Sequence, residues 1–86
     1  MPYIKKTYRD ELKEFTDMIE EFPLANPGEI NYIITKVLQK YEAHKGTSYQ
    51  VFNDITGALM NCYNEYYRRR IAPYEDQKIQ EHGYVS

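Results

Sequence analysis

The stretch Asn26-Pro27-Gly28-Glu29 is the sharpest structural signal in this chain of 86 residues. Asparagine is a strong helix N-cap, and proline suits the first helical position because its missing N–H has no partner there; Glu29 then occupies the third position. The next residues carry apolar side chains at helical intervals: Ile30, Ile33, Ile34, Val37, Leu38 and Tyr41. Gly46 supplies the left-handed stop that ends many helices. The sequence therefore predicts a helix over residues 27–45.

Helical patterns also lie on both sides of this segment. Residues 7–21 combine an apolar stripe with an acidic face, and we expect Thr7 to cap this helix and Pro23 to end it. The stripe consists of Leu12, Phe15, Met18, Ile19 and Phe22. Residues 49–70 show a third pattern after a Thr-Ser pair, with Phe52, Ile55, Leu59, Cys62, Tyr63 and Tyr66 on one face. We expect Cys62 to be a small core residue.

Pro73 interrupts the third pattern. A proline inside a helix removes one hydrogen bond and crowds the carbonyl four residues earlier, so we expect the chain to turn or kink there. Beyond the proline, residues 74–81 can form a short helix, with Gly83 as its stop. A minimal pairing of the extended ends, residues 2–5 and 84–85, is compatible with their composition. The resulting prediction is one all-α domain over residues 1–86, a compact bundle of three main helices plus a short C-terminal helix.

Composition excludes several classes of protein. The chain is 42% hydrophobic and 28% charged, which is too apolar for a disordered tail. A single cysteine allows neither a disulfide framework nor a cysteine-based zinc site. No apolar run is long enough to span a membrane, and the N-terminus lacks the apolar stretch of a secretory signal, so we expect a cytoplasmic protein. The formal charge of −2 argues against nucleic acid as a partner, since nucleic-acid-binding domains are usually basic.

The most site-like cluster is the run Glu65-Tyr66-Tyr67-Arg68-Arg69-Arg70. Guanidinium groups beside tyrosine rings can clamp a phosphate and stack on a base. The alternative is a helix surface on which the arginines pair with Glu65, Glu75 or Asp76. The chain contains ten tyrosines, for which boundary packing is the favoured interpretation, ahead of a subunit or protein interface and of a stacking surface for a ligand. The candidate binding residues are Tyr63, Tyr66, Tyr67, Arg68, Arg69, Arg70 and Tyr74.

No catalytic constellation stands out. His44 and His82 are isolated, and neither a phosphate-binding glycine loop nor an activated serine motif is present. The carboxylates of residues 10–21 have the spacing of a magnesium site, but a solvated helix face is the favoured interpretation. We expect no cofactor and no metal site, and an enzymatic activity is the minority interpretation.

Five sequence blocks occur in an order that resembles a known family. The blocks are Met1-Pro2-Tyr3-Ile4, Asn26-Pro27-Gly28-Glu29-Ile30-Asn31-Tyr32, Asn53-Asp54-x-x-Gly57-Ala58-Leu59, Glu65-Tyr66-Tyr67-Arg68-Arg69 and Ala72-Pro73-Tyr74-Glu75-Asp76-x-Lys78-Ile79. The resemblance is to short uncharacterised proteins of bacteria and their phages, classed as a domain of unknown function. It implies a phage or mobile-element setting. This sequence departs from the pattern at Met60, where an acidic residue is expected, and at residues 82–85, where an Asn-Gly-Asp-Val ending is expected.

Together these features predict a small non-enzymatic interaction protein that is homo-oligomeric and binds a host protein. The alternative is a nucleotide-ligand binder that sequesters a nucleotide signal through Arg68, Arg69 and Arg70 with neighbouring tyrosines. Less favoured alternatives are a sequence-tolerant nucleic-acid binder and a magnesium-dependent nucleotide hydrolase. The sequence leaves the partner and the number of subunits open.

Overall fold

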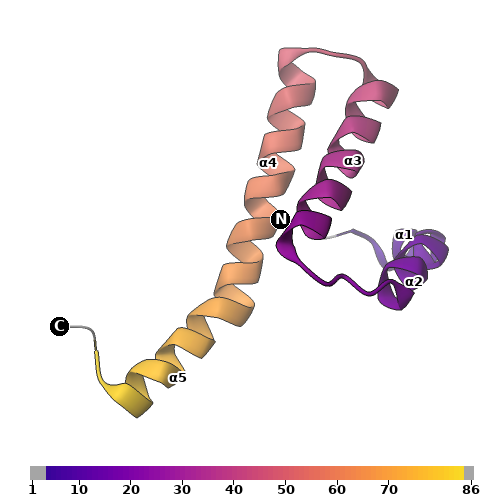
Figure 1. Ribbon diagram of the computed structural model, residues 1–86. Coiled ribbons are helices and arrows are strands. Elements are labelled where there is room, and N and C mark those ends of the chain that lie inside the picture. The colour runs from indigo at the N-terminus through magenta and orange to yellow at the C-terminus, as the bar shows by residue number, and fades with distance from the viewer. Residues whose placement is uncertain (1–3, 85–86) are drawn as a thin grey trace. The chain divides into compact units, whose positions relative to one another are not determined.

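The computed structural model describes residues 4–84, most of which are helical (Figure 1). Its elements are α1 (Lys6–Glu11), α2 (Lys13–Glu21), α3 (Pro27–Lys45), α4 (Tyr49–Tyr66), the π-helical turn η1 (Tyr67–Ile71) and α5 (Ala72–His82). The described residues contain no strand, which confirms the predicted all-α class. The pairing considered for residues 2–5 and 84–85 involves positions outside the described range.

The chain divides into two compact units, one over Tyr3–Ile55 and one over Thr56–Ser86. The boundary falls within the residues of α4. Each unit has its own local interactions, so each is described by itself.

The cap predicted at Asn26 organises the start of α3. The Asn26 side-chain oxygen accepts a hydrogen bond from the Glu29 N–H at 3.0 Å, and Pro27 occupies the first turn. Both carboxylate oxygens of Glu29 lie 3.5 Å from the Ala25 nitrogen, one residue further back than in a standard capping box. The start of α3 is therefore fixed by residues within one turn of each other, as the sequence predicted.

A left-handed glycine ends α3, also as predicted. Gly46 has φ +92°, and its N–H donates to the Glu42 carbonyl oxygen at 2.8 Å. The Thr47 hydroxyl donates to the Glu42 carboxylate at 2.8 Å, and Ser48 Oγ accepts from the Val51 N–H at 3.1 Å. The loop between α3 and α4 is thus held by a hydrogen bond at each side.

One side-chain cluster connects α3 to the first turns of α4. The Tyr41 hydroxyl donates to Asp54 Oδ2 at 3.0 Å, and the Gln50 amide donates to Asp54 Oδ1 at 2.8 Å. Because the Tyr41 hydroxyl donates to a carboxylate, which also repels the phenolate charge, the pKa of Tyr41 is raised. Both oxygens of Asp54 are therefore engaged within this unit.

The region before α3 differs from the prediction in two details. Helix α1 begins at Lys6 rather than after a Thr7 cap, because the N–H groups of Tyr8 and Arg9 donate to the Lys5 carbonyl and place Thr7 inside the helix. The expected single helix is also divided at Leu12, which has φ −88° and ψ 1°. Its end is as predicted, since α2 stops at Glu21 before the proline.

The helix after Tyr66 continues through the proline that was expected to interrupt it. The Ala72 N–H donates to the Tyr67 carbonyl, five residues earlier, which is the hydrogen bond of a π-helical turn. In a regular α-helix the Pro73 ring would crowd the Arg69 carbonyl. The wider turn accommodates the ring, so the chain stays helical until Gly83, the predicted stop, where φ is +82°.

The helices are loosely packed. Val51, which is 8% exposed, is the one buried apolar residue in the described part of the chain. Side chains of all three predicted apolar stripes remain open to solvent, among them Phe15, Phe22 and Leu59. Cys62 is exposed, so its prediction as a core residue was wrong, because its stripe is not covered within residues 56–84.

Replacing Asn26 by alanine removes the oxygen that accepts from the Glu29 N–H, so we expect the free energy of unfolding to fall by about 1 kcal/mol. Urea unfolding followed by far-ultraviolet circular dichroism measures this change. Asn26→Asp keeps the acceptor and should stay close to the wild type. Asn31→Ala, within the same helix, is the matched control. Equal losses for Asn26→Ala and Asn31→Ala would show that the cap contributes nothing.

Two glycines should respond to alanine with opposite signs. Gly46 has a positive φ, so Gly46→Ala should destabilise the protein by about 1–2 kcal/mol. A Cβ at Gly57 in α4 meets no atom within 4 Å, so Gly57→Ala should stabilise the helix by about 0.5–1 kcal/mol. Thermal unfolding of the two variants tests this pair. A destabilising Gly57→Ala would reveal a close approach of another helix to α4.

Candidate functional site

All seven candidate binding residues lie on one continuous helical stretch that runs from α4 through η1 into α5. They therefore belong to the unit over Thr56–Ser86. The structure arranges them in separate clusters along this stretch.

Glu65 holds two of the three arginines. Arg68 Nη2 lies 2.7 Å from Glu65 Oε2, and Arg69 Nε lies 2.8 Å from Glu65 Oε1. The Glu65 side chain is only 16% exposed, whereas the arginines are mostly exposed. The i,i+3 and i,i+4 ion pairs predicted from the spacing are thus confirmed. The two guanidinium groups are oriented by one carboxylate instead of converging on an open pocket.

A second cluster forms around Tyr67. Its ring stacks on that of Tyr63, with centroids 6.4 Å apart and planes at 25°. Its hydroxyl donates to Glu75 Oε1 at 2.6 Å, across the π-helical turn. This hydrogen bond to a carboxylate raises the pKa of Tyr67, and the negative charge of Glu75 adds to the effect. The neutral phenol therefore connects η1 to α5.

The remaining candidates, Tyr66, Arg70 and Tyr74, have side chains with no hydrogen bond or ion pair to the described residues. Lys78 Nζ lies 5.4 Å from the centre of the Tyr74 ring, a cation–π contact. Tyr66 is 62% exposed. Within the described residues, the guanidinium group of Arg70 has no hydrogen bond or ion pair. Tyr66 and Arg70 are thus the candidates most available to a partner.

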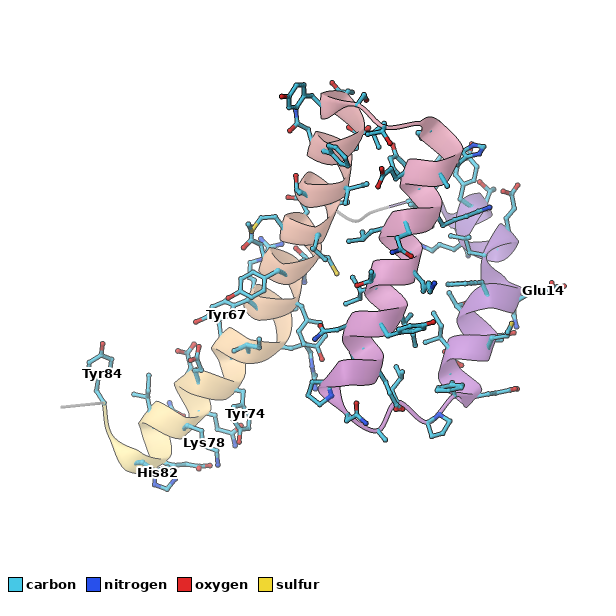
Figure 2. All side chains as sticks on the ribbon, turned by 45° about the horizontal axis from the view of Figure 1, so that its top comes forward. Glu14, Tyr67, Tyr74, Lys78, His82 and Tyr84 are labelled. Carbon is cyan, nitrogen blue, oxygen red and sulfur yellow. The ribbon has the colours of Figure 1, made fainter. Side chains whose placement is uncertain are left out.

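A hollow of about 640 Å³ lies along η1 and α5, and sequence reasoning did not identify it. Figure 2 shows Tyr67, Tyr74, Lys78 and His82 distributed along this segment and Tyr84 beyond its end. Its lining combines tyrosine rings with carboxylates and bases: Tyr67, Tyr74, Glu75, Asp76, Lys78, His82 and Tyr84. The available signal was the helical spacing of residues 67, 75, 78 and 82, which the expected interruption at Pro73 concealed.

The lining of this hollow has the chemistry of a surface that binds another protein. The hollow presents both charge signs and three aromatic rings, and the adjoining α4 surface is apolar around Leu59, Met60 and Tyr63. Tyrosine and arginine are the residue types enriched where proteins bind each other. A phosphate would have to compete with Glu65 for Arg68 and Arg69.

Within residues 4–84, no group of three or more histidine, cysteine, aspartate or glutamate side chains is arranged to hold a metal ion. None of the helices in that range combines the length and the apolar character needed to cross a membrane.

The fold and the candidate residues define a small helical protein with a tyrosine–arginine surface, which consists of the tyrosines and arginines of residues 63–74. The chain belongs to the family described as "Domain of unknown function (DUF6899)", whose sequence profile matches residues 1–85. No curated protein and no solved structure matches the chain.

The raised pKa of Tyr67 gives a direct test of its contact with Glu75. We expect the pKa of Tyr67 to lie above the ordinary tyrosine value of 10.0, and Glu75→Gln to lower it toward that value because the repelling charge is gone. Carbon-13 NMR of the tyrosine rings, assigned with Tyr67→Phe, measures the titration. Since the pKa is raised on folding, the contact stabilises the protein below pH 10 and is lost as pH rises through the folded pKa.

The control for this titration is Asp54→Asn, which should lower the pKa of Tyr41 and leave the pKa of Tyr67 unchanged. A Tyr67 pKa that is the same in the wild type and in Glu75→Gln would mean that the hydrogen bond to Glu75 does not form in solution.

Proposed function

We propose that this protein is a small non-enzymatic interaction protein that binds other protein chains and itself through exposed apolar and aromatic surfaces. The observation that carries the proposal is the burial pattern. Val51 is buried, while large apolar side chains along every α-helix remain more than a third exposed. Monomeric proteins rarely leave so much contiguous apolar surface in water, and large exposed patches mark interaction sites.

Energetics support the same conclusion. Ordering the backbone costs about 1–2 kcal/mol per residue, and burial of apolar surface returns only about 25 cal/mol per Å². A helical chain with so small a core gains little free energy from apolar burial by itself. Burial against another chain supplies the missing surface, and we infer that the protein functions in such a complex.

The binding surface we propose for the partner protein contains the tyrosines and arginines of residues 63–74. Tyr66 and Arg70 offer an open ring and an unpaired guanidinium, while Glu65 restrains the two neighbouring arginines. Side chains ordered before binding lose less entropy when the complex forms. We place this protein in the cytoplasm of a bacterium, in a phage or mobile-element setting, with a host protein as the partner.

The nucleotide-sequestering alternative uses the same residues. It requires Arg68 and Arg69 to exchange Glu65 for a phosphate, with Arg70 and a tyrosine ring completing the site. The carboxylate disfavours this exchange, so the protein-binding proposal has more support. Nucleic-acid binding and magnesium-dependent hydrolysis gain no support from the described residues.

Site-specific photocrosslinking tests the proposed surface. A benzophenone amino acid in place of Tyr66 should give covalent adducts of defined mass in bacterial cells, because this side chain faces the partner. The same group in place of Tyr49, which is 89% exposed but lies outside the surface, should not give those adducts. The Tyr66 adducts should decrease at least about fivefold with Arg70→Ala, a loss expected of an interface arginine.

Identical adducts from both positions, or none from Tyr66, would refute this surface. Native mass spectrometry of the purified wild type distinguishes the alternative. A retained nucleotide mass that disappears in Arg70→Ala would favour nucleotide sequestration over protein binding.

A further inference from the structure

A second surface lies in the other unit, between α2 and α3. Six apolar residues line a groove of about 190 Å³: Phe15, Met18, Ile19, Phe22, Leu24 and Ile33. Two further hollows continue it along α3 and share Phe15, Phe22 and Ile33 with it. The apolar lining is therefore continuous across the two helices.

The two walls of this groove carry opposite charges. On α2, Glu14 and Glu21 lie one turn before and one turn after Met18, so they border its side of the groove. Figure 2 shows Glu14 extending from α2 into solvent. On α3, Lys36 and Lys40 line the hollow that continues the groove beside Phe15. At the start of α3, Glu29 lines the other hollow, so the α3 side is basic only in its part beside Phe15. The groove thus has an acidic wall on α2 and, beside Phe15, a basic wall on α3.

These wall charges are available for pairing. None of the four takes part in an ion pair within 4.0 Å among the described residues, and Lys36 instead lies 5.5 Å from the centre of the Tyr32 ring. On α2, Lys13 and Asp17 pair with each other instead, with Lys13 Nζ 2.7 Å from Asp17 Oδ2. Within the described residues, the four charges that border the apolar groove are therefore open to a partner.

The exposed apolar area matches what one subunit of a dimer buries. Phe15, Met18, Ile19, Phe22, Leu24, Tyr32 and Val37 are each between about two fifths and seven tenths exposed. With the 150–250 Å² of an aromatic side chain as the scale for all seven, they present roughly 550–950 Å². A stable interface of standard size buries about 800 Å² per partner.

We propose that two copies of this protein pair through this groove about a two-fold axis, with α2 of each copy lying over α3 of the other. This arrangement places the acidic wall of one copy against the basic wall of its partner, twice in each dimer. A partner of a single charge sign would satisfy one wall and oppose the other. The groove is therefore self-complementary, as a two-fold interface must be. This inference rests on the self-association in the proposed function and assigns its surface.

Reciprocal charge reversal tests the pairing. Lys36→Glu with Lys40→Glu makes both walls acidic, and Glu14→Lys with Glu21→Lys makes both walls basic. Each double variant alone should dimerise at least about tenfold more weakly than the wild type, because like charges then oppose each other at both contacts. An equimolar mixture should restore dimers, because both contacts of the mixed pair again join opposite charges. Sedimentation equilibrium over a concentration series measures the dissociation constants.

Glu20→Lys and Lys45→Glu, each outside the groove, are the matched controls and should dimerise like the wild type, separately and mixed. Restoration in the mixture also shows that each double variant is folded. If the wild type dimerises but the reversals have no effect, or the mixture stays weak, the groove assignment is wrong while self-association stands. If the wild type is monomeric throughout, self-association itself fails, and the groove is left to a different protein.

Discussion

The scarcity of buried apolar surface is the constraint on which the rest of this structure depends. With Val51 as the one buried apolar residue in the described range, the helices are held by interactions between residues close in sequence. These include the Asn26 cap, the Gly46 stop and the ion pairs of Glu65. Isolated helices of this length are marginal in water, and most helical stability in proteins comes from packing of an apolar face. The apolar faces of this chain are formed but largely uncovered.

Interactions between residues close in sequence also explain which parts of the fold could be predicted from the sequence. The start of α3 and its end depend on residues within one turn, so a cap and a positive-φ glycine specify them. The break at Leu12 was not predictable in this way, because the apolar stripe continues through it without a proline or glycine. At Pro73 the signal was correct but admitted two outcomes. A π-helical turn absorbs the proline ring while keeping the helix, and nothing in the spacing distinguishes this from a turn of the chain.

The contrast between features fixed within one helical turn and features that depend on the course of the chain also applies to the candidate surface. Spacing alone predicted that Glu65 pairs with Arg68 and Arg69, because the three lie within one helical turn. The hydrogen bond from Tyr67 to Glu75 joins residues eight apart, and it depends on the helix continuing through η1. The hollow along α5 likewise exists only because the chain does not turn back at Pro73. The site residues were therefore predictable as a group, but their partners beyond the proline were not.

The α2–α3 groove and the tyrosine–arginine surface differ in chemistry. The α2–α3 groove carries both charge signs on separate walls, which is the property that lets identical chains pair. The tyrosine–arginine surface has clustered cations, of which Glu65 neutralises two in part, so two copies of it would repel at Arg70. A surface of that kind favours a different partner over a second copy. If the groove joins identical chains, folding and association are linked, and apparent stability rises with protein concentration. Each dimer would then present the tyrosine–arginine surface twice, so a partner with two binding sites gains avidity without any new contact.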